Sequence, residues 1–461
     1  MARSNCRRAV AWERIEMNNQ EKNAYPVKRP TVFIMVLAAF AVRFGFMMLL
    51  TTYQFNRVDD FSDGGETANI AASIANGHGF SSPFANQYTG PTAWIAPVYP
   101  YSISLVYRYL GRTELASPML IFTAQAALSA LTVIPILGIA GYTVGRSAGL
   151  LAAWTWTLFP WFSKWSVTWV WEVSLSALLL ASLAWYVLGL RGTSPYRHWI
   201  GLGALEGFAL LVNPALATFL LVSVVWCRWG LHLRKREWFK PAAAMTVCLL
   251  VVSPWMIRNR AVFGQWVFLR GNFGYEFYQG NYHLSQGHGS GARHPMGNPK
   301  EYEDYKRLGE VGYIQSRQKT GLQFVREHPA EFIWVSLKRA TYFWRGTSLL
   351  ARIPWYWVPA SFAVLSYLSL FAVVTMFRRK PYAWQVLLGV ILLYPLPYYL
   401  TFNETRYRHA IEPIMLLLVA YVLERALAYL VETVDGRSAR TPRSAAAGAV
   451  AGESPLPFHR T

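Results

Sequence analysis

Apolar segments of about twenty residues recur along the chain and are separated by short polar stretches. Wound as a helix, a segment of this length crosses the hydrocarbon core of a bilayer, which is roughly 30 Å thick. The fold class that follows is an all-α polytopic membrane protein. The pattern predicts ten spanning helices, at residues 31–53, 117–141, 147–163, 167–190, 198–212, 214–230, 241–257, 354–377, 383–402 and 407–431.

Two further stretches are apolar but interrupted by charged residues or prolines. Residues 95–111 contain Pro97, Pro100 and Arg108, and residues 330–346 contain Lys338 and Arg339. Such mixed composition is typical of helices that lie in the membrane interface. We therefore expect two interfacial helices beside the ten spans.

Basic residues in the short loops predict the orientation, because cytoplasmic loops of membrane proteins are enriched in Lys and Arg. If the two weak stretches do not span, the N-terminus lies on the same side of the membrane as the basic short loops. These loops contain Arg146, Arg191, Arg197 and the segments 234–240 and 378–380. We expect both termini in the cytoplasm of a bacterial-type inner membrane.

The same topology divides the chain into regions. A large periplasmic loop is expected at 258–353, and a smaller one at 54–116 interrupts the transmembrane core. The tail is rich in Ala, Gly, Pro and Ser and is expected to be disordered. The predicted regions are a basic cytoplasmic tail (1–30), the core with its periplasmic loop (31–257), the large loop (258–353), C-terminal helices (354–431) and the disordered tail (432–461).

Composition excludes several classes of protein. Hydrophobic residues make up 54% of the chain and charged residues 15%, and the formal net charge is +20. The basic residues are dispersed and no nucleic-acid-binding motif is present, so a nucleic acid partner is not expected. The cysteines (Cys6, Cys227 and Cys248) are too scattered to predict a disulfide framework or a zinc site.

Carboxylates gather just after the first span, at Asp59, Asp60, Asp63 and Glu66. The following residues, TANIAASIANG, predict a short helix that stops at a glycine. Asp63 and Glu66 are three residues apart and share one face if the helix begins early. Two close carboxylates shift one pKa upward and suit general-base catalysis, although a solvated loop face is the alternative.

The order of these features resembles the GT-C superfamily of integral membrane glycosyltransferases. The acidic cluster is followed by IAASIANGHGF, by GPTAWIAPVYP and by the first interfacial helix. The resemblance is nearest to the protein O-mannosyltransferase and aminoarabinose-transferase branch, and it covers roughly residues 31–431. It implies an inverting transferase that takes a sugar from a polyprenyl-phosphate donor at the periplasmic face. It also implies that no metal cofactor is needed.

The resemblance assigns roles to several acids. Counted back from Ile70, the Asp of the branch's Asp-Glu pair falls on Asp63 and the Glu falls on Gly64. The catalytic base or acceptor holder is then Asp63 or Glu66, and Asp60 is a secondary candidate. Glu172 lies in WSVTWVWEVSLS, which resembles the second external turn of the family, and would assist. Because the second acid of the pair is displaced, the acceptor remains open among lipid, glycan and protein.

The leaving group of such a reaction is a phosphate, and arginine binds phosphate oxygens through paired contacts. Arg258 lies at the outer end of the seventh predicted span, and Arg406, Arg408 and His409 lie at that of the tenth. We expect these residues, with Arg270, to bind the donor phosphate. Contact with lipid headgroups is the alternative for each.

Other interpretations compete with an enzyme. A transporter or flippase of a lipid-linked intermediate would carry repeats and ionisable residues at mid-membrane, where only Arg43 and Glu206 fit. Arg43 is kept as a secondary site candidate. A non-catalytic scaffold is a third possibility. His283, His288 and His294 are spaced five and six residues apart, which matches no strong metal-ligand motif.

Overall fold

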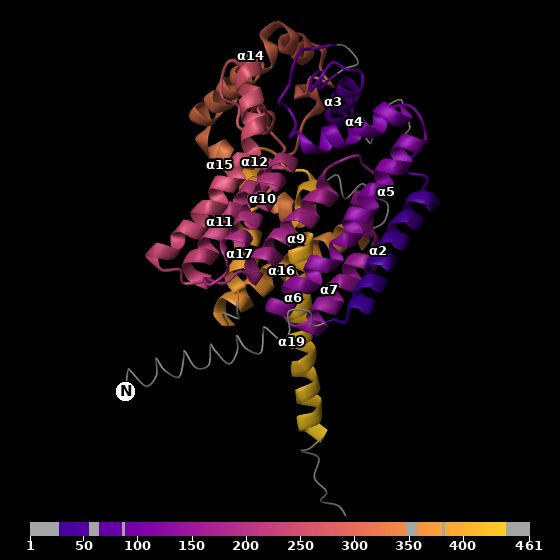
Figure 1. Ribbon diagram of the computed structural model, residues 1–461, viewed down its shortest axis with the longest axis vertical. Coiled ribbons are helices and arrows are strands. Elements are labelled where there is room, and N and C mark those ends of the chain that lie inside the picture. Colours follow the sequence, from indigo (N-terminus) through magenta and orange to yellow (C-terminus); the bar gives the residue numbers. More distant parts are fainter. Residues whose placement is uncertain (1–26, 55–63, 85–87, 347–356, 380–382, 439–461) are drawn as a thin grey trace, which may run out of the picture.

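A computed structural model describes residues 27–54, 64–84, 88–346, 357–379 and 383–438 of the chain. Within these ranges the regular structure is helical, and the only β-pairing is an isolated bridge between Ser81 and Pro91. The long apolar helices stand side by side as a bundle, and shorter polar helices gather at one end of it (Figure 1). The predicted all-α fold class is confirmed.

Each of the predicted spans falls on a helix or on consecutive helices of the bundle. Helices long and apolar enough to cross a membrane cover Arg29–Leu49, Ala116–Tyr142, Lys235–Phe263, Ala360–Arg379 and Thr405–Val431. The bundle helices are α2 (Arg29–Leu49), α5 (Ala116–Leu131), α6 (Val133–Tyr142), α7 (Arg146–Leu158), α8 (Pro160–Val167), α9 (Val173–Gly189), α10 (Tyr196–Val212), α11 (Thr218–Val225), α12 (Phe239–Phe263), α16 (Trp357–Arg379), α17 (Trp384–Leu393), α18 (Leu396–Leu400) and α19 (Glu412–Ser438).

Two of the differences from the sequence pattern concern where an element begins or ends. The predicted span 147–163 is divided into α7 and α8, because Pro160 lacks an N–H and fixes its φ, so a new helix begins there. At the other end of the chain, the tail predicted to be disordered from residue 432 is still helical as far as Ser438. Residues 439–461 lie outside the described part of the chain.

The two interfacial stretches form amphipathic helices, α4 (Val98–Leu110) and α15 (Pro329–Arg345). Neither is among the apolar helices that could cross a membrane. In α15, Val335, Arg339 and Phe343 are spaced by four residues and form the buried face. Arg339 donates hydrogen bonds to Asn281 Oδ1 (2.9 Å) and to the Leu400 carbonyl (3.1 Å), so this face is attached to the bundle end.

The polar helices form a layer over one end of the bundle (Figure 1). Besides α4 and α15, the layer contains α3 (Glu66–Ala75), α13 (Phe273–Gly280) and α14 (Pro299–Glu327). Its core is aromatic: Trp94, Tyr275, Tyr305 and Tyr313 are buried against one another. This aromatic core joins the chain segment before α4 to helices that lie some 200 residues later.

A buried network of charged side chains connects helices of the bundle near the start of α19. Glu412 accepts hydrogen bonds from Arg408 (2.9 Å), from the His409 Nδ1 (2.8 Å) and from the Trp161 indole (3.0 Å). The Arg408 guanidinium also donates to the Phe362 carbonyl (3.0 Å), which lies on α16. Burial of a charge is tolerated when it is paired and hydrogen-bonded, so this network ties α8, α16 and α19 together.

Replacing Glu412 by glutamine is therefore expected to destabilise the protein, because the buried Arg408 guanidinium loses its counter-ion. Breaking a buried pair costs about 3–5 kcal/mol, whereas an exposed pair contributes under about 1 kcal/mol. The apparent Tm of the purified protein measures the effect. The control is Glu303→Gln, which removes an exposed ion pair with Lys306. Equal Tm values for the two variants would contradict a stabilising role for the network.

Candidate functional site

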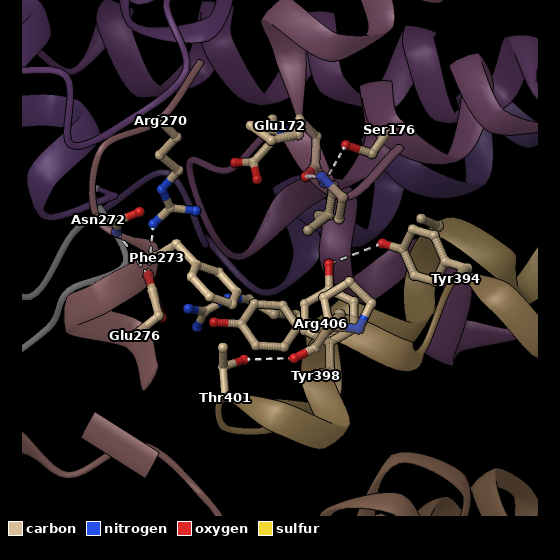
Figure 2. Close-up of a pocket in the computed structure, with 17 residues that line it drawn as sticks. Glu172, Ser176, Arg270, Asn272, Phe273, Glu276, Tyr394, Tyr398, Thr401 and Arg406 are labelled. Atoms are coloured by element: carbon tan, nitrogen blue, oxygen red, sulfur yellow. Dashed lines mark hydrogen bonds and ion pairs between the residues drawn. The ribbon is translucent and has the colours of Figure 1, made fainter. Parts of the chain in front are cut away.

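Two cavities meet where the bundle joins the layer of polar helices. The first, which we name the layer cavity, has a volume of about 390 Å³. The second, the bundle cavity, has a volume of about 260 Å³ and extends between the ends of α9, α17 and α18 (Figure 2). The two cavities share a polar wall made of Glu172, Asn213, Arg270, Glu276 and Arg406.

Four carboxylates line the layer cavity, those of Glu66, Glu172, Glu276 and Glu404, and the first three come from distant segments. Glu66 is the first residue of α3, Glu172 precedes α9, and Glu276 lies on α13. The first two approach each other because Gly64 packs against the turn before Glu172. A Cβ on Gly64 would lie 2.5 Å from the Val170 carbonyl oxygen, and its φ is +92°, so a glycine is required there.

Arg270 lies on the wall that the two cavities share. Its Nε donates to the Trp94 carbonyl (2.7 Å), and its Nη2 donates to Glu276 Oε1 (2.9 Å). Figure 2 shows the guanidinium between the carboxylates of Glu172 and Glu276. Because the hydrogen bond to Trp94 fixes the Nε end of the guanidinium group, the positive charge of Arg270 is held at a defined place in the wall.

Arg406 provides a second cation on the same wall. It lies in the short helix η7 (Thr405–Ile411), and its guanidinium carbon is 3.7 Å from the centre of the Trp171 ring. Within the described part of the chain, its buried Nε has no hydrogen-bond partner. Arg406 and Arg270 are thus the wall residues suited to binding an anionic group.

The carboxylates of the layer cavity differ in pKa. Burial by itself would raise the pKa of Glu66, but a hydrogen bond from His294 (3.0 Å) and the positive charge of that ring lower it to about 2. Burial raises the pKa of Glu172 and that of Glu276, with Arg270 offsetting part of the increase. A carboxylate that stays ionised beside others that hold protons more readily is typical of an acid–base site.

A buried carboxylate outside the cavity fixes part of its wall. Glu310, on α14, accepts hydrogen bonds from the Ala93 amide (2.7 Å), the Tyr305 hydroxyl (3.0 Å) and the Thr92 hydroxyl. Burial raises its pKa to about 7. The Gly271 amide in turn donates to the Ala93 carbonyl (2.8 Å), so Glu310 also fixes the loop that carries Arg270.

The structure therefore brings four of the sequence-predicted site residues to one place: Glu66, Glu172, Arg270 and Arg406. Asp60 and Asp63 lie outside the described residues. Among the described residues, no three His, Cys, Asp or Glu side chains cluster as metal ligands would.

The remaining predicted phosphate ligands (Arg258, Arg408 and His409) and the secondary candidate Arg43 lie elsewhere. Arg258 donates to the Thr92 (2.7 Å) and Phe80 (2.9 Å) carbonyls and connects α12 to the layer. Arg408 and His409 belong to the Glu412 network described above. Arg43 donates to Ser129 Oγ (2.8 Å) and to the Trp156 carbonyl (2.9 Å) inside the bundle. None of these four residues lines the layer cavity or the bundle cavity as described.

The sequence pattern did not indicate two residues of the cavity. In the sequence His294 stands out only as one of three spaced histidines, whereas in the structure it contacts a carboxylate 228 positions away. Glu276 lies in an aromatic stretch, GYEFYQG, and its carboxylate is the one feature of that stretch that indicates a site residue. Both residues reach the cavity through tertiary contacts, since α13 packs on α14 and His294, in the segment between these helices, contacts Glu66. Short-range patterns do not encode such contacts.

Comparisons with known proteins bear on the fold. No protein-family model and no curated protein matches the sequence. A solved structure of the oligosaccharyltransferase AglB from Archaeoglobus fulgidus, in complex with an inhibitory peptide and a dolichol-phosphate, is similar with a TM-score of 0.51 and 12% identity. The similarity covers 90% of this chain and 52% of that one. This chain therefore spans about half the length of the oligosaccharyltransferase.

Two other structures add to the comparison. The Archaeoglobus fulgidus oligosaccharyltransferase tethered with an acceptor peptide has a TM-score of 0.53 at 12% identity, covering 90% of this chain and 52% of that one. ArnT from Cupriavidus metallidurans, bound to undecaprenyl phosphate, has a TM-score of 0.38 at 15% identity, covering 86% and 78%. The oligosaccharyltransferase comparisons show that this chain shares the fold of the part of that protein which it covers.

Proposed function

We propose that this protein is an inverting membrane glycosyltransferase that moves a sugar from a polyprenyl-phosphate donor to a lipid, glycan or protein acceptor. The observation that carries the proposal is the shared wall, where two guanidinium groups and two carboxylates lie between a polar and a more apolar cavity. The GT-C fold and the position of the wall at the end of an apolar bundle support it. In the predicted topology this wall faces the periplasm.

The donor would occupy the bundle cavity. Phe273, Tyr394, Pro397 and Tyr398 give that cavity aromatic and apolar surface, and the polar wall lies at its edge. When the bond between the sugar C1 and the phosphate oxygen breaks, its electron pair goes to that oxygen. Guanidinium groups already in place stabilise the growing negative charge. In this proposal Arg270 and Arg406 do so, whereas Arg258, Arg408 and His409 maintain the framework.

The acceptor would enter through the layer cavity. As its oxygen or nitrogen bonds to C1 of the sugar, its proton passes to a carboxylate. Glu66 is ionised and lies at the cavity wall, and Asp63, three residues earlier, is the alternative base. Glu172, whose pKa burial raises, is a stronger proton acceptor that would assist. Attack opposite to the departing phosphate inverts C1, and the proposal includes no metal ion.

Mass spectrometry of cell-envelope glycolipids and glycoproteins tests the function. A strain that lacks the gene is compared with strains complemented by the wild type or by Glu172→Gln. The expected result is that one sugar is missing in the deletion strain, returns with the wild type and does not return with the variant. Identical glycan profiles in all three strains would refute the proposal.

The histidine beside Glu66 is expected to set the acidic limit of the pH profile. Because His294 lowers the pKa of Glu66 to about 2, the carboxylate stays ionised in moderately acidic solution. His294→Gln removes the positive charge, and the remaining lowering causes, a backbone hydrogen bond and Arg270, are smaller than those of the histidine. The pKa of Glu66 therefore rises, and its ionised form is lost earlier as the pH falls. We expect the acid limb of the transfer rate to move upward by about 1–3 pH units.

Transfer rates in membrane vesicles across a pH series measure this shift. The control is His283→Gln, since the His283 ring meets Glu331 (3.0 Å) outside both cavities. A profile for His294→Gln that overlays the wild-type curve would show that Glu66 ionisation does not limit transfer at acidic pH.

A further inference from the structure

A third cavity lies beside the C-terminal half of α3, between that helix, the end of α4 and the residues His78, Ser82 and Tyr88. We name it the α3–α4 cavity, and its volume is about 490 Å³. Its lining residues include Asn69, Asn76, His78, Tyr88 and Arg112, and none of its lining residues lines the layer cavity or the bundle cavity as described. α3 and α4 lie at the end of the bundle where the candidate site lies (Figure 1).

The side chains of α3 give this cavity a polar floor. Asn69, Ser73 and Asn76 are spaced by four and three residues, so they share one face of the helix. The Asn69 amide donates to the Pro83 carbonyl (3.1 Å), and the hydroxyls of Ser73 and Ser81 are hydrogen-bonded (2.6 Å). The cavity is thus held in shape by contacts between α3 and the following segment, and Asn76 lies exposed at its edge.

Aromatic rings border the same cavity. Tyr88 is 64% exposed, and its ring meets the His78 ring edge-on, with centroids 6.2 Å apart. Tyr107, from the last turn of α4, contributes a third ring. Amides and hydroxyls both donate and accept hydrogen bonds, and aromatic faces pack on C–H surfaces. A sugar ring offers both kinds of surface, with hydroxyls around its edge and C–H groups on its faces.

The electrostatics favour a neutral ligand. Arg112 is the one described lining residue that is always charged, and it already has an interaction partner, so its charge is not left over for a ligand. The cavity lies at the C-terminal end of α3, where the partial negative charge of the helix dipole disfavours an anion. A lipid chain is disfavoured as well, because amides and hydroxyls would lose their hydrogen bonds to water.

We propose that the α3–α4 cavity binds a neutral sugar unit of the acceptor, which is therefore a glycan. The inference rests on the proposed function and specifies the class of acceptor. Glu66 and Asn76 stand at the two ends of α3, ten residues and so about 15 Å apart along its axis. An oligosaccharide of several units covers that distance, with its reacting end at Glu66 and an earlier sugar at Asn76.

Saturation-transfer NMR on the 461-residue chain in lipid nanodiscs, prepared without sugar-based detergent, tests the binding site. The probes are methyl glycosides of glucose, galactose, mannose and N-acetylglucosamine. We expect a signal from at least one glycoside with the wild type and with Glu172→Gln. We expect at least a tenfold weaker signal with Asn76→Leu and with Tyr88→Ala, both of which change exposed side chains.

Other outcomes overturn the inference. Absence of any glycoside signal with the wild type, or an unchanged signal with both Asn76→Leu and Tyr88→Ala, would refute sugar binding in this cavity. Competition by inorganic phosphate would identify an anion site instead. A signal lost in Glu172→Gln but kept in Asn76→Leu would place the sugar at the candidate site. That last result leaves the proposed function standing, whereas an unchanged envelope glycan profile in the deletion strain removes the function itself.

Discussion

Replacing Arg406 by glutamine is expected to reduce sugar transfer by about 100-fold to 1000-fold, the loss observed when one preorganised charge stabiliser is removed from an active site. The guanidinium lies against the Trp171 ring on the wall that both cavities share. Its buried Nε has no partner within the described part of the chain, so the group is free to take one from a ligand. Glutamine keeps a similar length but carries no charge.

A lysine at position 406 distinguishes the effect of the positive charge from that of the donor geometry. Arg406→Lys keeps a cation but loses the planar arrangement of donors that contacts two phosphate oxygens at once. We expect its transfer rate to lie between those of the wild type and Arg406→Gln. Equal losses in the two variants would show that the paired contacts, and not the charge, dominate.

The measurement is the rate at which the transferred sugar appears on the envelope acceptor in membranes from complemented strains. Arg326→Gln serves as the control, because it removes an equal charge from an exposed position on α14. Protein amount and apparent Tm are compared to exclude misfolding. Wild-type transfer by well-folded Arg406→Gln would end the assignment of this arginine to the donor phosphate.

Replacing Glu66 by glutamine is expected to have the second large effect, a reduction of sugar transfer by about 100-fold to 10,000-fold. This is the range that a positioned acid or base contributes. Glutamine preserves the shape of the side chain and accepts the His294 hydrogen bond, but it takes up no proton. The lost step is the removal of the acceptor proton. The protein should retain its fold, because Glu66 lies at a cavity wall and not in the packed aromatic core.

Comparison with Asp63→Asn decides between the two candidate bases. If Glu66 is the base, Glu66→Gln loses the larger factor, and if Asp63 is the base, the order reverses. The exposed Glu303→Gln variant again controls for the loss of a charge. Full turnover in both single variants would mean that neither carboxylate removes the acceptor proton.

The bundle could be predicted from the sequence because its signal is local and strong. A run such as 31–53 has few polar interruptions, and its length alone indicates a helix that crosses a bilayer. The interfacial helices α4 and α15 could be predicted from their mixed composition. The break at Pro160 shows the limit, since an apolar pattern does not reveal where one helix stops and another begins.

The site could be predicted only in part, because side-chain direction depends on helix rotation. Arg406 and Arg408 are two residues apart on one helical turn and therefore point to different sides. Arg406 faces the cavities, whereas Arg408 faces Glu412 inside the bundle. Their position in the sequence alone predicts that both arginines bind the donor phosphate. Glu276 and His294 could not be placed, because their approach to Glu66 depends on tertiary packing.

The wide sequence separation of the cavity walls has a consequence for biosynthesis. Translation delivers Glu66 and Glu172 more than 200 residues before Arg406 and Tyr407. A nascent chain that has inserted its first helices therefore holds one half of the wall without the other. Under the proposed function, a polypeptide that terminates before Arg406 lacks one of the two donor-phosphate ligands, so it is expected to leave the cell's activated sugars unused.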